Sequence, residues 1–406
     1  MLSFLISGLI PVALVLIFRY VNKKYEPPIF GIYQTKNKNY WLKFVFMYIV
    51  IRLRQLFNHV RRILDVEYGR SADGTAHIHQ QDAALEQKYF LGDDPLAIDA
   101  VYFNGVSEND VFVCNVARRQ GFVCDALLML KVNGEELLLH SNLPDTQMKQ
   151  EPIEEGEYRV QGIVINNFMP MRTWKVSYDG EMKSRSDPNK KVNVKVSLTW
   201  SAHFPPFNYD TQMSARSLAR DMAKEPWSRT YFKLLKKLHQ THYEQMGFLK
   251  GTVTVNDKEH TVNIPCVRDH SFGPFRDWRT FHRYVLHFIF LENGDSMAVG
   301  VVSQPSVLSH LTIGYVCRKL DNQRVFPVDS CDFHLYQHGE NKIMPKDYAF
   351  SFEAGRQSYV VRVNFKDEEP FYIGDGKAAV IYERWCAVEV NGVKGWACVE
   401  CQYKNA

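Results

Sequence analysis

The sequence predicts a mainly β protein in which two antiparallel barrels are joined by a helical segment and preceded by N-terminal membrane helices. Three observations support this fold class. Residues 1–18 contain no charged side chain. From about residue 98, apolar and polar residues alternate with period two, which is typical of strands that bury one face. The alternation is interrupted once, at about 212–243, where apolar residues recur at helical spacing.

The N-terminal segment 1–20 is predicted to be a transmembrane signal anchor. A helix over its uncharged part would cover roughly 27 Å, close to the thickness of a bilayer core. Arg19, Lys23 and Lys24 follow it, so the positive-inside rule places the body in the cytosol. The chain is thus expected to cross the membrane once. A cleaved signal peptide and a buried helix are the alternatives. Against a cleaved signal peptide, the sequence has neither a basic N-terminal start nor a cleavage site of small residues. The endoplasmic reticulum is the default membrane for a short anchor.

The next segment, 21–75, is predicted to be basic, helical and interfacial. Residues 19–62 contain ten Lys or Arg and one acidic residue, Glu26, so they carry +9, whereas the whole chain carries +4. The remaining body is therefore mildly acidic, at −5. This distribution argues against nucleic-acid binding by the body and favours contact of the basic segment with anionic lipid.

An apolar run within this segment, 40–57, predicts a helix that lies in the headgroup region of a membrane. Its uninterrupted part is too short to span a bilayer. Lys43, Arg52 and Arg54 bracket the run, and their long stems could reach outward to the headgroups. The alternative is a helix that packs on the globular body.

The body divides into a first β domain at 76–211, a helical connector at 212–246 and a second β domain at 247–406. Turn signals such as Asn133-Gly134 and Asp179-Gly180 separate the strand-like runs of the first domain. Those runs are 100–106, 110–118, 121–132, 135–141, 158–167, 172–180 and 192–204. Strands resume at Gly247 and continue to the end of the chain. Two antiparallel meanders of similar size fit two barrels, and such barrels often enclose an apolar ligand.

The segment 242–278 carries a specific motif. It contains Tyr243-Glu244-Gln245, Gly251, Arg268-Asp269-His270-Ser271-Phe272-Gly273 and Arg276-Asp277-Trp278, and Gly395, Trp396 and Glu400 stand near the end of the chain. With these residues the sequence resembles the double-lipocalin family that includes carotenoid 1,2-hydratase and the AttH-like proteins. The resemblance covers roughly 80–406, and the membrane end lies outside it. A similar anchored arrangement occurs in animal members of the family.

This resemblance implies two lipocalin-like barrels and a hydrophobic ligand. Some members of the family are enzymes that act on isoprenoid chains, and fungal members look like carriers of sphingolipid at membranes. The resemblance therefore implies a ligand class, and it leaves both a carrier and an enzyme open.

As an enzyme, the chain would use the acids of the motif. Hydration of an alkene needs an acid that protonates carbon, an aromatic face that stabilises the cation and a base that delivers water. Asp269, His270 and Asp277 are the catalytic candidates, and a carboxyl buried among aromatic side chains would have a raised pKa. The motif departs from hydratase-like members at Phe272, where those members tend to have Trp.

The motif can also be interpreted as a binding site or as a structural network. The candidates for ligand contact are Arg268, Phe272, Arg276, Trp278, Tyr243 and Glu244. In the structural interpretation, Arg268, Arg276 and Arg279 pair with Asp269 and Asp277 and hold the loop at a barrel mouth. Such pairing would lower the pKa of each aspartic acid and make it a poor general acid.

The remaining motifs predict neither a metal nor a cofactor. Cys398 and Cys401 form one isolated CxxC, and on a strand their side chains would point to opposite faces. The sequence has no P-loop frame and no Gly-x-Ser-x-Gly elbow. We therefore expect a membrane-anchored protein that binds or transfers a lipid or isoprenoid-like ligand in a lipocalin-type cavity. The alternative is an enzyme with hydratase-like or isomerase-like acid–base chemistry. The membrane is expected to contact 1–20 and 40–57.

Overall fold

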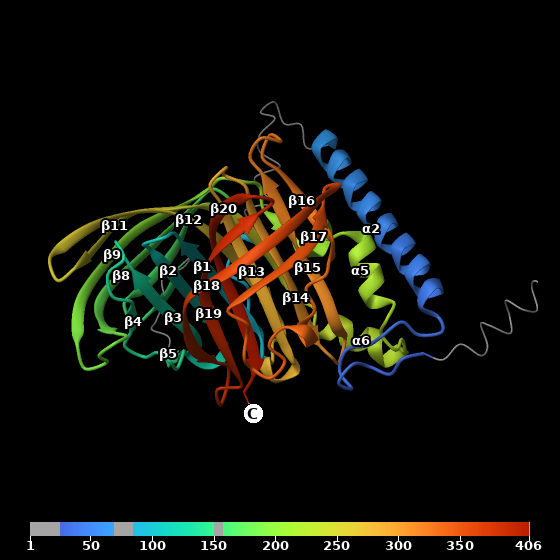
Figure 1. The fold of residues 1–406 in the computed structure, drawn as a ribbon, viewed down its shortest axis with the longest axis horizontal. Coiled ribbons are helices and arrows are strands. Elements are labelled where there is room, and N and C mark those ends of the chain that lie inside the picture. The colour runs from blue at the N-terminus through green and yellow to red at the C-terminus, as the bar shows by residue number, and fades with distance from the viewer. Residues whose placement is uncertain (1–24, 69–83, 150–156, 406) are drawn as a thin grey trace, which may run out of the picture.

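The computed structural model describes residues 25–68, 84–149 and 157–405. The predicted anchor at 1–20 lies outside this part of the chain. The described residues form two β barrels side by side, with helices along one flank of the second barrel (Figure 1).

The first barrel is the ring β11–β12–β1–β2–β3–β4–β8–β9, which closes because β9 pairs with both β8 and β11. All of its pairings are antiparallel. The ring strands are β1 (Ile98–Val106), β2 (Val111–Arg118), β3 (Val123–Lys131), β4 (Leu138–His140), β8 (Thr173–Ser184), β9 (Lys191–Ala202), β11 (Thr241–Val255) and β12 (Lys258–Gly273). Short strands extend it: β5 (Gln147–Lys149), β6 (Glu157–Val160), β7 (Ile163–Met169) and β10 (Phe207–Asn208).

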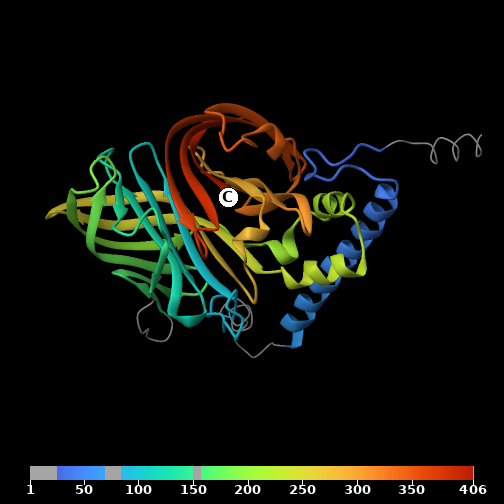
Figure 2. The ribbon, with the colours of Figure 1, turned by 90° about the horizontal axis from the view of Figure 1, so that it is seen from below.

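The second barrel is closed by eight antiparallel strands in sequence order, because β13 pairs with β20. Its strands are β13 (Arg283–Leu291), β14 (Ser296–Gln304), β15 (Leu308–Arg318), β16 (Arg324–Cys331), β17 (Asp347–Ala354), β18 (Gln357–Ile373), β19 (Ala379–Val390) and β20 (Val393–Lys404). Figure 2 shows this barrel end-on, with the first barrel beside it.

Packed side chains fill the inward positions of both barrels. In the first barrel, Phe103, Trp174 and Trp200 are fully buried in one apolar cluster. In the second barrel, Val361 and Phe350 belong to a separate cluster. Period-two alternation places these residues inside, since successive side chains of a strand point to opposite faces.

The connector between β10 and β11 is helical, with α4 (Tyr209–Gln212), α5 (Ala215–Met222) and α6 (Arg229–Lys237). The Ser214 hydroxyl caps α5 by accepting a hydrogen bond from the backbone N–H of Ser217, and Ser228 caps α6 in the same way. Single turns of 3₁₀ helix lie at η1 (Gln120–Phe122), η2 (Trp278–Thr280) and η3 (Leu335–Gln337).

Strand pairing divides the body at a different place from the one that the sequence predicted. The prediction assigned 247–406 to the second β domain and ended the connector at residue 246. Instead, β11 begins at Thr241 and pairs with β9, and β12 pairs with β1. Both strands therefore complete the first barrel, and the second begins at Arg283. Sequence order suggested the other division, because the long-range pairing of β12 with β1 is not visible locally.

The helix α2 (Tyr40–Tyr68) lies along the outside of the connector (Figures 1 and 2). Its inner face packs through Met47, Phe44 and Ile51 against α5 and the start of β15. The predicted helix at 40–57 is thus present and packs on the body, which was the alternative to a free interfacial helix. Among the described residues, no helix combines the length and apolar character needed to cross a bilayer.

Candidate functional site

The motif on β12 is split between two environments by the alternation of the strand. Arg268, His270 and Phe272 point into the first barrel, whereas Asp269 and Ser271 point outward, toward the second barrel. Residues that are adjacent in the sequence therefore serve two different sites. Their closeness in the sequence had suggested a single site.

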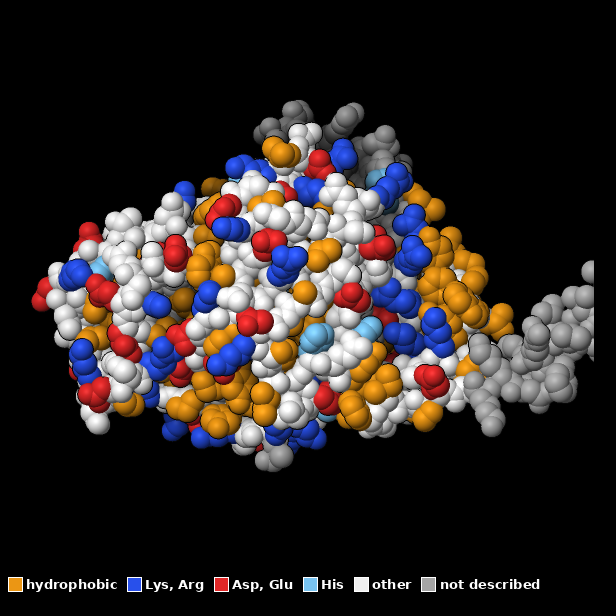
Figure 3. Space-filling view, in the orientation of Figure 1, with side chains coloured by type: hydrophobic (Ala, Val, Ile, Leu, Met, Phe, Trp, Pro, Cys, Tyr) orange, Lys and Arg blue, Asp and Glu red, His pale blue; other side chains and the backbone are white. Residues whose placement is uncertain are grey.

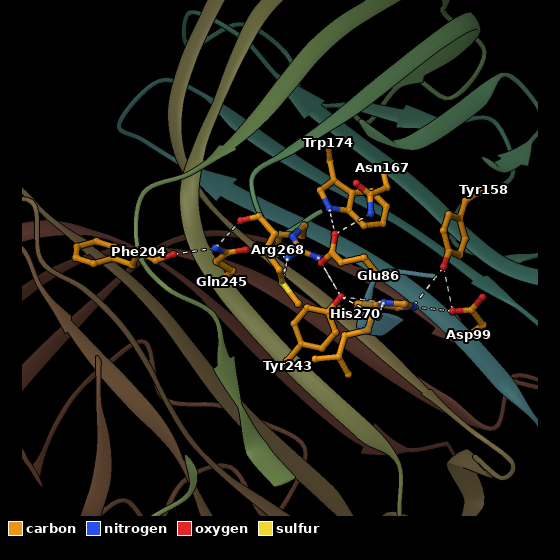
Figure 4. A network of polar contacts seen from close by, with 12 residues as sticks. Glu86, Asp99, Tyr158, Asn167, Trp174, Phe204, Tyr243, Gln245, Arg268 and His270 are labelled. Atoms are coloured by element: carbon orange, nitrogen blue, oxygen red, sulfur yellow. Dashed lines mark hydrogen bonds and ion pairs between the residues drawn. The ribbon is translucent and has the colours of Figure 1, made fainter. Parts of the chain in front are cut away.

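The inward arginine, Arg268, has no exposed surface, and polar side chains and aromatic rings surround its guanidinium (Figure 4), although its Nε has no hydrogen-bond partner among the described residues. Its guanidinium pairs with the Glu86 carboxylate at 2.8 Å and donates to the side-chain oxygen of Gln245 at 2.9 Å. The indole rings of Trp174 and Trp200 face it at 5.2 and 5.0 Å. The predicted pairing of Arg268 with a motif aspartate does not occur, because that aspartate points to the other face.

The inward histidine, His270, is also held by contacts to both of its ring nitrogens. Its Nε2 contacts the Asp99 carboxylate at 2.7 Å, and its Nδ1 contacts the Leu85 carbonyl at 3.1 Å. Asp99 also accepts hydrogen bonds from Arg118 at 2.7 Å and from the Tyr158 hydroxyl at 3.0 Å. Both nitrogens of His270 are thus engaged inside the barrel.

The other inward candidates join the same network. The Tyr243 hydroxyl donates to Glu86 at 2.7 Å. Phe272 lies near the barrel mouth, where its ring stacks on Tyr89 and leans on His270. This inward half of the motif is therefore a buried structural core, which agrees with the structural interpretation, although its partners differ from those expected.

The outward half of the motif lines a cavity of about 340 Å³ between the two barrels and the connector. Most of its wall is apolar and comes from both barrels, as with Ile98 on β1, Ile313 on β15 and Ile381 on β19. A minority of polar side chains reaches it: Tyr102, Asn115, Gln240, His242, Asp269, Ser271, Arg276, Tyr284, Gln304 and Glu400. An apolar cavity with a few convergent polar groups is the usual form of a small-molecule site.

The carboxyl of Asp269 has an unusual place in this cavity. Among the described residues, none forms an ion pair with it or donates a hydrogen bond to it. Burial raises the pKa of Asp269 from 3.8 to about 7, against the opposing charge of His242 and with a further rise from Glu244. Asp269 is therefore protonated for part of the time near neutral pH, as an acid catalyst requires.

Three side chains stand around Asp269. Arg276 donates from Nε to Gln240 at 2.6 Å, and burial, with the nearby Arg119, lowers its pKa to about 10. His242 contacts the Glu244 carboxylate at 3.0 Å. Burial opposes protonation of His242, but Glu244 and Asp269 together raise its pKa above the usual value. Glu244 is itself buried and lies behind His242, outside the cavity wall.

A second pair of acids was missed by the sequence analysis. Glu383 on β19 and Glu400 on β20 are directly opposite each other, and both are buried. The Tyr102 hydroxyl donates to Glu383 at 2.8 Å, and the Tyr284 hydroxyl donates to Glu400. Burial raises the pKa of both glutamic acids, and repulsion between the carboxyls raises that of Glu383 further.

Both carboxyls are therefore harder to ionise than a free glutamic acid, as buried neighbouring acids usually are. Only Glu400 reaches the cavity. The available signal in the sequence was a glutamate within each of two apolar strands, 379–390 and 393–404. It could not show that the two positions face each other, because that depends on the register of β19 with β20.

The two remaining candidates, Trp278 and Asp277, lie in different places. Trp278 is buried and forms part of the cavity wall. Asp277 lies outside the cavity, where it caps η2 and pairs with Arg279 at 2.8 Å. Burial acts to raise the pKa of Asp277, but the hydrogen bonds from Arg279 outweigh it and the net pKa is lowered. Asp277 is therefore the one motif aspartate that is paired with arginine, and it is not positioned for catalysis in this cavity.

The described residues contain no group of three or more His, Cys, Asp or Glu side chains that could hold a metal ion. Cys398 and Cys401 belong to different apolar clusters, on the outer and inner faces of the second barrel, and neither forms a disulfide. The side chains that line the cavity include carboxylic acids, a histidine, an arginine and tyrosine hydroxyls beside an apolar wall.

Comparison with solved structures finds the same fold in a putative AttH (NE1406) from Nitrosomonas europaea, at 10% identity and a TM-score of 0.52. The match covers 75% of this chain and 92% of that one. Kievitone hydratase from Nectria haematococca is also matched, at 11% identity and a TM-score of 0.46, over 78% of this chain and 93% of that one. At these identities the comparison concerns the fold alone.

No curated protein matches the chain by sequence. The profile of one family does match, over residues 4–403, and its description is "Family of unknown function (DUF8627)". The chain belongs to this family.

Proposed function

We propose that this protein binds a small apolar molecule in the cavity between its two barrels, at the surface of a membrane. The observation that carries the proposal is the cavity itself, with a mainly apolar wall that is built jointly by both barrels and the connector. The sequence predicted a ligand inside a barrel, but the inward positions are filled by packed cores. The space between the barrels is the better candidate for the ligand.

Ligand binding is tested by narrowing the cavity. Ile313→Trp adds bulk to the cavity wall, whereas Val360→Trp makes a comparable change on the exposed surface of β18. We expect native mass spectrometry of the gently extracted full chain to show a co-purifying lipid. The lipid should be lost from Ile313→Trp and kept by Val360→Trp. Wild-type protein that is free of ligand, or equal occupancy in both variants, would count against the proposal.

Membrane association is supported by the outer face of α2. We use this name for the exposed apolar side chains that form one stripe of the helix: Trp41, Leu42, Val45, Phe46, Ile49, Leu53, Leu56, Phe57 and Val60. Figure 3 shows them as an apolar band beside a band of Lys and Arg. A contiguous exposed apolar surface of this kind is rare on a protein that meets only water.

The chemistry of this surface favours a bilayer with anionic lipid as its partner. Lys43 is turned toward the body, where its Nζ donates to the Glu225 carbonyl at 2.6 Å and lies over the Trp227 ring at 5.4 Å, whereas Arg54 is exposed on the same helix. Apolar side chains would enter the acyl boundary while exposed cations such as Arg54 meet the headgroups. The apolar segment 1–20 would anchor the chain nearby, with the body in the cytosol and the endoplasmic reticulum as the default membrane.

Flotation of the full chain with vesicles tests the contribution of α2. Leu53→Glu and Phe57→Glu together place two charges in the outer face of α2, and Leu320→Glu is the control at a separate exposed apolar residue. We expect the double variant to float less completely with vesicles that contain phosphatidylserine, whereas the control should behave as wild type. Equal flotation of all three would mean that α2 does not touch the lipid.

An acid–base enzyme is the second candidate, and the raised pKa of Asp269 favours it. A protonated Asp269 could donate its proton to an alkene carbon, and the aromatic wall at Trp278 and Tyr284 would stabilise the resulting cation. For hydration, water would then form the C–O bond while Glu400 accepts a proton from it. For isomerisation, Glu400 would instead accept a proton from the neighbouring carbon, which forms the new double bond.

This candidate is tested on the lipid that co-purifies with the protein. Incubation in D₂O should place deuterium on carbon if a proton is transferred, and mass spectrometry detects it. Asp269→Asn should bind the lipid but leave it unlabelled, whereas Asp277→Asn, which lies outside the cavity, should label it normally. A lipid that stays unlabelled with wild-type protein would leave binding as the function.

A further inference from the structure

A second pocket, of about 400 Å³, lies beneath α2. Its wall combines Tyr48, Arg52 and Gln55 of α2 with 212–216 of the connector and with Pro327 and Asp329 of β16. In contrast to the cavity between the barrels, this pocket is lined mainly by polar side chains. We call it the α2 pocket.

The α2 pocket meets the cavity between the barrels at one residue. Met213, between α4 and α5, lines both spaces. The side-chain nitrogen of Gln55 donates a hydrogen bond to the Met213 carbonyl at 2.9 Å, which fixes the backbone there to α2. The unbranched Met213 side chain thus lies between an apolar space and a polar one, and such a side chain adapts readily to a neighbour.

The charges of the α2 pocket are unbalanced. Arg52 and Arg216 both line it, and no ion pair joins either of them to a residue of the described chain, although Nη1 of Arg52 donates a hydrogen bond to Gln55 at 3.3 Å. The one acid in its wall, Asp329, already accepts a hydrogen bond from the Ser214 hydroxyl at 2.6 Å. Two guanidinium groups therefore stand beside a single, partly engaged carboxylate, which suits an anionic group that binds through two arginines.

We propose that the ligand is one amphipathic molecule with an anionic head, which extends through both spaces. Its apolar chain lies in the cavity between the barrels, its neck passes Met213, and its carboxylate or phosphate head meets Arg52 and Arg216. This inference rests on the proposed function and narrows its ligand class. Since α2 forms a wall of the head site and turns its outer face away from the body, a lipid from the adjoining bilayer would have a short path to both spaces.

The test compares two probes with the same chain, dodecanoate and dodecanol, by calorimetry on the full chain in nanodiscs of uncharged lipid. We expect wild-type protein to bind dodecanoate about tenfold more tightly, which corresponds to about 1.4 kcal/mol. Arg52→Gln with Arg216→Gln should remove this preference and leave dodecanol binding unchanged. The matched control, Arg229→Gln with Arg324→Gln, removes two exposed arginines outside the pocket and should keep the preference.

Each outcome is decisive. If wild-type protein binds both probes equally, the proposal of an anionic head group is refuted, but the proposal of a ligand in the cavity still stands. If the control pair also loses the preference, general surface charge explains it and the head site is wrong. If neither probe binds, and Ile313→Trp behaves like wild type, both this inference and the proposed function fail.

Discussion

Replacement of Asp269 by Asn should stabilise the protein, and the gain should grow as the pH rises. The folded protein holds the proton of Asp269 up to about pH 7, whereas the ordinary pKa is 3.8. Between these values the folded state binds more protons than the unfolded chain, so the stability of the wild-type protein falls with rising pH. Asn has no proton to lose, and the variant escapes this loss.

The size of the effect follows from the pKa. Each pH unit inside the window costs the wild-type protein about 1.4 kcal/mol relative to the variant. From about pH 5 to about pH 7 the advantage of Asp269→Asn should therefore grow by about 2 kcal/mol, and it should level off above about pH 8. A constant difference between Asp and Asn cancels in this comparison, because only the change with pH is used. In thermal unfolding, each kcal/mol gained in the free energy of unfolding should raise the Tm by roughly 2–4 °C.

Urea unfolding of wild-type protein and Asp269→Asn, in steps from about pH 5 to about pH 8, measures this growth directly. Asp277→Asn is the matched control, since Asp277 pairs with Arg279 and has a lowered pKa. Its difference from wild type should not become more favourable over this range. A difference between Asp269→Asn and wild type that stays flat with pH would refute a buried, unpaired carboxyl and restore the arginine-paired interpretation.

Two further predictions concern the first barrel. Arg268→Met should lower the free energy of unfolding by about 3–5 kcal/mol, because the Glu86 carboxylate stays buried without its cation, and Glu86→Gln in the same chain should recover part of the loss. Urea unfolding measures both, and no recovery in the double variant would contradict the pairing. Gly251→Ala should cost at least about 2 kcal/mol in the same assay, since Gly251 has a φ of +148° and a Cβ would lie 2.1 Å from the Ser197 carbonyl oxygen. Wild-type stability of this variant would contradict the close approach of β11 and β9.

Much of the fold could be predicted because the strands of such barrels alternate apolar and polar residues, and this alternation is visible in the sequence. The period-two runs of the first domain correspond to β1–β4 and β6–β9, and the helical spacing after Pro226 corresponds to α6. The apolar run at 40–57 is a helix, and it continues to Tyr68. These features are local, so they depend on neighbouring residues alone.

The candidate site was predictable only in part. Asp269, Arg276 and Trp278 do line the cavity, whereas His270, Arg268 and Tyr243 belong to a core network inside the first barrel. Glu86, the partner of Arg268, is 182 residues away from it in sequence and carries no pattern that would identify it. Strand alternation alone could have separated Asp269 from its two neighbours, but it could not say which face was the ligand face.

The sequence by itself determined the strand content, the basic and apolar character of the N-terminal region and the presence of a specific motif near residue 270. Those properties follow from composition and from periodicity along a single strand or helix. Only the tertiary structure decided that β11 and β12 close the first barrel, that Glu383 faces Glu400, and that the open space lies between the barrels. The physical reason is that register and barrel closure bring together residues that are far apart in the chain. A cavity exists only where two such surfaces meet without filling the space between them.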